Sequence, residues 1–303
     1  MSEQPLLDVE NLWVRFQTRT GIFDAVRGVS FTLGKERLGI VGESGSGKSM
    51  TGRAILRLIR PPGIVKAAHI ALEGTDLMGL SEKEMRSVRG SRISMVMQDP
   101  KFSLNPVMTI GDQIMEAYRL HNSVSKSEAY KKSLEMLQAV SIRDSERVMR
   151  AYPHEMSGGM RQRVSIAMAL ANDPDLIIAD EPTTALDVTI QAQILALLSD
   201  LRKERRLALV FITHDFGVVG QLCDRVAVMY AGRIVETGPT KDVLAKPAHP
   251  YTARLIECVP ELGGGQRELQ AIPGLPPAVD NLPRGCAFAP RCQVAKETCR
   301  TGE

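Results

Sequence analysis

Eight residues near the N-terminus, 42–49, constrain this chain more than any others. They read Gly-Glu-Ser-Gly-Ser-Gly-Lys-Ser and fit the pattern G-x-x-x-x-G-K-[ST]. An apolar run, residues 38–41, precedes them, and a stretch with helical character, residues 50–60, follows. In that setting the glycines let successive main-chain N–H groups face one anion, and the helix adds the positive end of its dipole. The octapeptide therefore predicts a phosphate-binding loop in preference to a glycine-rich surface turn.

Two side chains of this loop have expected roles. Lys48 brings a positive charge to the outer phosphates, and Ser49 offers a hydroxyl to Mg²⁺. The main chain of the remaining loop positions is expected to cradle the phosphates, at Gly42, Ser44, Gly45 and Gly47. Phe16 ends an earlier strand and is a candidate to stack on an adenine ring, with Phe23 as a weaker rival and simple core packing as the alternative.

Composition sets wide bounds on the class of protein. The chain has 303 residues, of which 44% are hydrophobic and 24% charged, as in ordinary globular proteins. A net charge of +3 is too small to indicate a nucleic-acid partner. No apolar run approaches the roughly 18 residues of a membrane span, and the N-terminus lacks the order of a signal peptide. We therefore expect a cytosolic protein that reaches a membrane only through a partner.

Three further apolar strands end in polar residues. Gln98 follows residues 93–97, Asp180 and Glu181 end residues 176–181, and His214 follows residues 207–213. Parallel strands in open α/β sheets bind ligands at their carboxyl ends, so these tips are expected to meet the loop. Asp180 is then a Mg²⁺ anchor and Glu181 orients the attacking water. His214 would bond the terminal phosphate, and Gln98 would sense the metal and the water, as phosphoryl transfer requires.

The periodicity predicts an α/β fold with a mostly parallel sheet and further parts around it. Strands at residues 6–16 and 21–33 form an antiparallel β subdomain, and a short edge strand covers 70–76. Helical spacing over residues 109–150 indicates a helical insertion, assigned to about 105–160. A hairpin at 225–230 and 233–236 closes the nucleotide-binding domain, 1–238. The proline-rich C-terminal module, 239–303, is expected to be small and irregular, with a flexible link at 263–265.

The order of these motifs resembles the ATP-binding cassette family. The phosphate loop, Gln98, the Ser157–Gly158–Gly159 signature, Asp180–Glu181, Leu186–Asp187 and His214 follow one another as they do there, over residues 5–240. The resemblance implies a P-loop NTPase fold and ATP hydrolysis with Mg²⁺. It also implies that two cassettes sandwich two nucleotides, so that residues 157–160 contact ATP held by another subunit and Asp187 helps to join the pair.

The signature departs from the family pattern at one position. Met160 stands where the family usually has glutamine, and a thioether cannot donate a hydrogen bond. Ser157 and both glycines are intact, so we expect the site to be used, with altered tuning.

A narrower resemblance concerns the substrate. Gln98-Asp99-Pro100 with Ser103-Leu104-Asn105-Pro106, then Tyr152-Pro153-His154-Glu155 and His249-Pro250-Tyr251-Thr252, resemble ATPases of dipeptide and oligopeptide importers. Nickel and glutathione importers are related alternatives. The resemblance implies two membrane-spanning permease subunits, a periplasmic or extracellular binding protein and a partner ATPase, which we expect to be a paralogue, with the chain on the cytoplasmic face of the inner membrane. We interpret these motifs as lineage markers without contact to the cargo.

Three of the five cysteines gather near the C-terminus, at Cys286, Cys292 and Cys299. This spacing resembles a cysteine motif of the same importers that binds an iron–sulfur cluster, and a [4Fe–4S] cluster usually takes four thiolates. Cys258 is the nearest fourth ligand, and Cys223 a less suitable one. Structural zinc and three unliganded thiols remain alternatives.

Two other function classes fit parts of the sequence. A cassette ATPase outside transport would usually carry a long coiled coil or a second cassette, and a phosphate-loop kinase would need a lid in place of the signature. Neither the coiled coil nor the second cassette is visible in the sequence.

Overall fold

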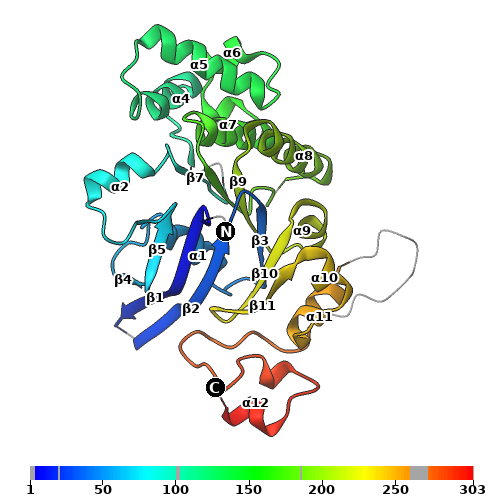
Figure 1. Ribbon diagram of the computed structural model, residues 1–303. Helices are drawn as coiled ribbons and strands as arrows, with labels where there is room; N and C mark the ends of the chain where they lie inside the picture. Colours follow the sequence, from blue (N-terminus) through cyan, green and yellow to red (C-terminus); the bar gives the residue numbers. More distant parts are fainter. Residues whose placement is uncertain (1–3, 20, 100–102, 185, 260–271, 303) are drawn as a thin grey trace. The chain divides into compact units, whose positions relative to one another are not determined.

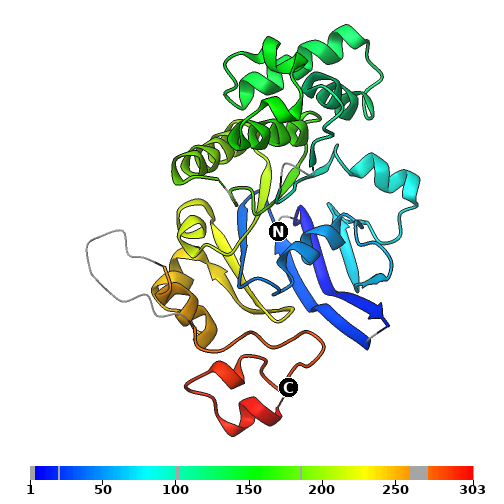
Figure 2. The same cartoon turned by 180° about the vertical axis from the view of Figure 1, so that it is seen from behind.

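A computed structural model describes residues 4–19, 21–99, 103–184, 186–259 and 272–302 (Figures 1 and 2). Pro100 and the expected link at 263–265 lie outside these ranges. The chain forms two compact units: unit 1 comprises Met1–Gly79 and Phe211–Glu303, and unit 2 comprises Leu80–Val210. Among the described residues, no helix combines the length and apolar character needed to cross a membrane.

Unit 1 contains an antiparallel sheet, as predicted. β1 (Leu7–Thr18) pairs with β2 (Gly21–Leu33), β4 (Gly63–Lys66) and β5 (His69–Leu72), and β5 pairs with β6 (Thr75–Asp76). The pairing of β1 with β2 shifts between Val9 and Leu12, where Asn11 has a φ of 52°. This bulge keeps both Val9 and Leu12 buried although they are three residues apart. The sequence analysis missed β4, because four residues after a Pro-Pro turn carry too little alternation.

The strand that feeds the phosphate loop is buried in unit 1. β3 (Arg37–Val41) lies parallel to β10 (Arg225–Tyr230), which pairs antiparallel with β11 (Arg233–Pro239). The predicted hairpin turn is confirmed, with Ala231 at φ 45° and Gly232 at φ 83°. Helix α9 (Phe216–Leu222) packs so closely on β3 that a Cβ on Gly39 would lie 2.8 Å from Val219 Cγ1.

Unit 2 contains a parallel strand pair and a group of helices. β7 (Ile93–Val96) lies parallel to β8 (Leu176–Asp180), every residue of which is buried. The helices expected between these strands are present. They are α4 (Ile110–Arg119), α5 (Lys126–Ala139), α6 (Ser145–Arg150) and α7 (Gly158–Leu170), with the short 3₁₀ turn η1 (Pro153–Glu155) before α7, whereas α2 (Glu82–Val88) precedes β7.

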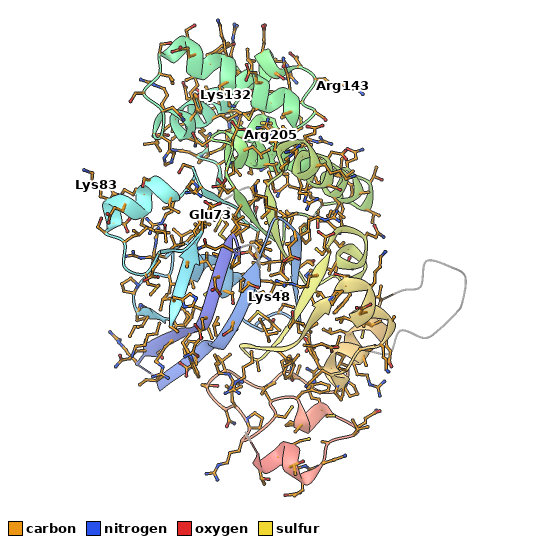
Figure 3. All side chains as sticks on the ribbon, in the orientation of Figure 1. Lys48, Glu73, Lys83, Lys132, Arg143 and Arg205 are labelled. Carbon is orange, nitrogen blue, oxygen red and sulfur yellow. The ribbon has the colours of Figure 1, made fainter. Side chains whose placement is uncertain are left out.

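Helix α8 (Val188–Arg205) follows β8 and leads to β9 (Ala208–Thr213), the strand that runs from unit 2 into unit 1. Asp173 forms ion pairs with two helices of unit 2: with Lys132 of α5, at 2.9 Å, and with Arg205 of α8. Lys132 and Arg205 are labelled in Figure 3. The predicted α/β fold with an inserted helical region is therefore observed.

The C-terminal module is more regular than predicted. Helices α10 (Thr240–Ala245), α11 (Pro250–Glu257) and α12 (Glu297–Thr301) and the 3₁₀ turn η2 (Ala289–Arg291) occur within it. The expectation of little regular structure was wrong for α10 and α11. Proline was taken as a helix breaker, whereas Pro250 stands at the first position of α11, where a missing N–H costs nothing.

Three aromatic side chains fix this module to the sheet of unit 1. Tyr230 of β10 lies 4.4 Å from Tyr251 of α11 between ring centroids, and Phe288 lies 5.4 Å from Tyr230 and 5.3 Å from Tyr251. All three are at most 2% exposed. Because such rings bury large apolar areas, this cluster stabilises the contact of the module with β10.

Replacing one ring of this cluster tests its contribution. We expect Phe288→Ala to lower the free energy of unfolding by about 3–5 kcal/mol, because it opens a cavity among buried rings. Leu275→Ala removes a side chain that is 88% exposed and should change it by less than about 0.5 kcal/mol. Urea titration followed by circular dichroism measures both. Equal effects of the two substitutions would contradict the packing described.

Candidate active site

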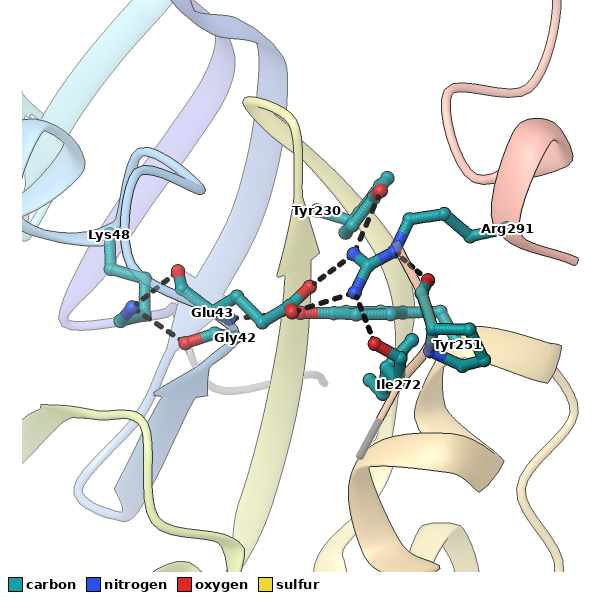
Figure 4. A network of polar contacts seen from close by, with 8 residues as sticks. Gly42, Glu43, Lys48, Tyr230, Tyr251, Ile272 and Arg291 are labelled. Carbon is teal, nitrogen blue, oxygen red and sulfur yellow. Dashed lines mark hydrogen bonds and ion pairs between the residues drawn. The ribbon is translucent and has the colours of Figure 1, made fainter. Parts of the chain in front are cut away.

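The phosphate loop surrounds a buried lysine in unit 1. Lys48 is 4% exposed, and its Nζ donates hydrogen bonds to the main-chain oxygens of Gly42 at 2.7 Å and Glu43 at 3.0 Å (Figure 4). Helix α1 (Lys48–Ile55) begins at this residue and ends earlier than the predicted residue 60. The N-terminal end of α1 therefore adjoins the loop, as an anion site requires.

Two glycines of the loop are needed for close approach as well as for turning. Gly47 has a φ of 100°, and a Cβ there would lie 2.5 Å from the main-chain oxygen of Ala25. A Cβ on Gly42 would lie 2.1 Å from the main-chain oxygen of Met229. Any side chain at these positions would push the loop away from β10 and its neighbours.

One buried polar atom in the loop suits a phosphate. Ser46 is 4% exposed, and within the described part of the chain its Oγ has no hydrogen-bond partner. The Ser46 hydroxyl and the main chain of the curled loop supply hydrogen-bond donors, and the adjacent Lys48 ammonium supplies positive charge. These residues fit a nucleotide phosphate.

The two aromatic candidates for adenine contact each other. Phe16 of β1 and Phe23 of β2 face across the strand pair, with centroids 5.4 Å apart and ring planes at 19°. Phe16 is half-buried. The two rings thus make one aromatic surface, and stacking of adenine on Phe16 stays a prediction.

Two of the polar strand tips meet in unit 2. Glu181 follows β8 with a φ of 45° and is 9% exposed. Its Oε2 accepts hydrogen bonds from Gln98 Nε2 and from Thr184 Oγ1, both at 2.9 Å. The left-handed main chain after Asp180 turns Glu181 out of the strand line, a strained conformation that is typical of functional residues.

The predicted site residues are shared between the units. Phe16, the loop, Lys48, Ser49 and the exposed His214 belong to unit 1. Gln98, the buried Asp180, Glu181 and residues 157–160 belong to unit 2. Convergence of the two sets on one triphosphate therefore stays a prediction.

The Ser-Gly-Gly signature forms the start of α7 in unit 2. Ser157 caps the helix, and its Oγ accepts a hydrogen bond from the Met160 N–H at 3.3 Å. The helix starts at Gly158, inside the signature. A Cβ on Gly159 would lie 2.6 Å from Ile190 Cγ2. The signature thus offers the N-terminal end of a 13-residue helix.

Asp187 has a local role in addition to the predicted one. It caps α8, and its Oδ1 accepts a hydrogen bond from the Ile190 N–H at 3.0 Å. Its predicted contribution to joining two cassettes is not tested by this contact.

The sequence analysis missed a polar network behind the phosphate loop (Figure 4). Arg291 donates to both carboxylate oxygens of Glu43, at 2.8 and 3.0 Å, and Tyr251 Oη accepts a hydrogen bond from the Glu43 N–H at 2.9 Å. Tyr251 belongs to the motif His249-Pro250-Tyr251-Thr252, which we had interpreted only as a lineage marker. No sequence signal joined positions 43 and 291, because neither belongs to a pattern that contains the other.

The C-terminal cysteines do not assemble a metal site in the described part of the chain. The Cys286 N–H donates to the Cys299 main-chain oxygen at 2.9 Å, so these two residues are neighbours. However, no group of three His, Cys, Asp or Glu side chains within the described ranges is arranged to hold a metal ion. Burial raises the pKa of the Cys223 thiol to about 12, which disfavours the thiolate that a metal needs. The arrangement of the described cysteines does not fit a cluster.

Comparison with family models defines the class of protein. The model for the ABC transporter family matches residues 26–184, and the model for the oligopeptide/dipeptide transporter C-terminal region matches residues 235–299. The chain belongs to the ATP-binding cassette family.

Individual relatives narrow the resemblance. The chain is 51% identical over 297 residues to the oligopeptide transport ATP-binding protein OppD of Haemophilus influenzae, covering 98% of this chain and 92% of that one. It is 55% identical over 293 residues to OppD of Bacillus subtilis, covering 96% of this chain and 82% of that one. A solved ATP-binding cassette dimer, described as a post-hydrolysis state bound to ADP and Pi, is 28% identical with a TM-score of 0.69, covering 77% of this chain and 98% of that one.

His249 is the N-cap of α11, and its pKa predicts that the stability of the fold depends on pH. His249 Nδ1 accepts a hydrogen bond from the Tyr251 N–H at 3.1 Å, and burial lowers the pKa of His249, with Glu236 opposing that shift. The unfolded chain therefore takes up this proton at a higher pH than the folded chain, at about 6.5. Stability should fall as the pH drops through that value.

We expect the urea midpoint of the wild type to decrease more between pH 7.5 and 5.5 than that of His249→Asn, which keeps a capping acceptor but cannot titrate. Titrations at both pH values measure the difference. Equal decreases in the two proteins would show that His249 does not contribute.

Proposed function

We propose that this protein is the ATP-binding and ATP-hydrolysing subunit that energises import of oligopeptides across a membrane. The observation that carries this proposal is the combination of a P-loop around Lys48 with a C-terminal region of the oligopeptide/dipeptide transporter type. The relatives named OppD, at about half identity over nearly the whole chain, support the same substrate class.

In the proposed site, the phosphates are held by unit 1. The main chain of Gly42, Ser44, Gly45 and Gly47 and the Lys48 ammonium would contact them, and His214 would bond the terminal phosphate. Mg²⁺ would be held by Ser49, Gln98 and Asp180 and would neutralise charge on the phosphates. Phe16 would stack on the adenine.

Glu181 would orient and polarise the attacking water. Its Oε2 accepts hydrogen bonds from Gln98 and Thr184, which hold the carboxylate in place at the end of β8. Gln98 would then report the presence of metal and water to the helical region that follows it in sequence. Catalysis by this arrangement is mostly alignment and charge stabilisation.

The assembly would contain two cassettes and two permease subunits. Residues 157–160 would bind the ATP of the partner cassette, and Asp187 would help to join the two cassettes. We favour a paralogue as the partner. A binding protein outside the membrane would deliver the peptide, and this chain would lie on the cytoplasmic face. We propose no nucleic-acid partner.

Glu181→Gln separates binding from chemistry. We expect the dissociation constant for ATP to stay within about twofold and turnover to fall by at least about 100-fold, because the amide cannot accept a proton from water. Fluorescent-ATP titration and phosphate release measure the two quantities. Glu204→Gln, an exposed change on α8, serves as the matched control. Normal turnover in Glu181→Gln would remove the assigned role.

Lys48→Ala tests the phosphate loop itself. We expect the dissociation constant for ATP to rise at least about tenfold, because a buried cation aimed at the phosphates is lost. Lys83→Ala on α2, an exposed lysine labelled in Figure 3, should leave binding unchanged. Unchanged affinity in Lys48→Ala would refute phosphate binding at this loop.

Reconstitution tests the coupling to transport. With the permease subunits and binding protein in proteoliposomes, oligopeptide should stimulate ATP hydrolysis. A protein that purifies without membrane partners and hydrolyses ATP independently of peptide would instead be a cassette ATPase outside transport.

A further inference from the structure

The second residue of the phosphate loop is held at three points. The Glu43 main-chain oxygen accepts from Lys48 Nζ, its N–H donates to Tyr251 Oη, and its carboxylate pairs with Arg291 (Figure 4). Only the first of these contacts comes from the loop itself. The other two come from the C-terminal module, more than two hundred positions away in sequence.

The Arg291 side chain is buried and is held by several hydrogen bonds. Its side chain is 5% exposed, and besides Glu43 it donates to the Tyr230 hydroxyl at 3.2 Å and to the main-chain oxygens of Pro273 and Ile272 at 3.0 and 3.3 Å. Its guanidinium carbon lies 5.9 Å from the ring centroids of Tyr230 and Phe288. A planar fork with five donors suits this set of acceptors, and a lysine would not.

The contacts act on a loop that must be curled before it binds. Ordering a loop when its ligand arrives costs conformational entropy, so a loop that is already held binds more tightly. The Glu43 side chain and N–H point toward the module, whereas its carbonyl faces Lys48 (Figure 4). The module therefore steadies the loop from behind without occupying the place of the phosphates.

We infer that the C-terminal module sets the nucleotide affinity of this ATPase, with Arg291 as the residue that positions the phosphate loop through Glu43. This inference rests on ATP binding by the loop, as proposed above, and goes beyond it by giving the module a role in that binding. A partner or a chemical change that displaces Arg291 would therefore weaken ATP binding, even if that partner or change does not contact the loop itself.

The test compares two arginines that fasten the same module. Arg291 reaches the loop, whereas Arg254 of α11 pairs with Glu257 at 2.7 Å and donates to Gln293. We expect Arg291→Gln to raise the dissociation constant for mant-ATP by about tenfold. Arg254→Gln should leave it within about twofold, and Arg291→Lys should restore only part of the loss, because lysine keeps the charge without the fork.

A double-mutant cycle distinguishes loss of the Arg291–Glu43 pair from general unfolding of the variants. Glu43→Gln removes the same pair from the loop side, and Glu43→Gln with Arg291→Gln should cost no more affinity than either change alone. Thermal melts identify any variant that does not fold, and if Arg291→Gln is one, Glu43→Gln against Arg254→Gln decides.

An unchanged dissociation constant in folded Arg291→Gln, an equal loss in Arg254→Gln, or additive effects in the cycle would each overturn the inference. Failure of the wild type to bind mant-ATP would instead contradict the proposed function.

Discussion

A lysine ammonium is buried at the start of α1 and held by two main-chain oxygens of the loop that precedes it. A buried cation is stable only when its donors are satisfied, so the carbonyls of Gly42 and Glu43 must point inward. That requirement fixes the curl of the loop, and the curl excludes a Cβ at Gly42 and Gly47, which pack against main-chain oxygens. In this conformation the loop joins the end of β3 to the start of α1 and lies against the main chain of Met229 in β10.

Each unit prepares its own part of the proposed site. In unit 1, Lys48 and the loop amides form the phosphate cradle. In unit 2, Gln98 and Glu181 are already hydrogen-bonded, and Ser157 caps α7. In the proposed mechanism the loop, Gln98 and Glu181 act on the same triphosphate, whereas the signature at the start of α7 contacts the ATP of the partner cassette. The buried charges and strained Glu181 thus have a common explanation in phosphoryl transfer.

The sequence was most informative where function depends on local order. The phosphate loop, the polar strand tips and the helical run after Gln98 could be read directly, because each is a short pattern tied to one element. Helices α10 and α11 were missed because prolines mark helix starts as well as breaks. The Arg291–Glu43 pair was missed for a different reason: its partners are 248 positions apart, and tertiary packing, including that of Tyr230, Tyr251 and Phe288, brings them together.

The most direct test of the account is a crystal structure of the protein with Mg²⁺ and a non-hydrolysable ATP analogue. We predict one analogue with its terminal phosphate within hydrogen-bond distance of Lys48 and His214 and its Mg²⁺ bound by Ser49. Glu181 would face that phosphate across one water, and the signature of a second chain would close the site. An analogue bound away from Lys48, or one that Lys48 and Glu181 do not share, would contradict the account.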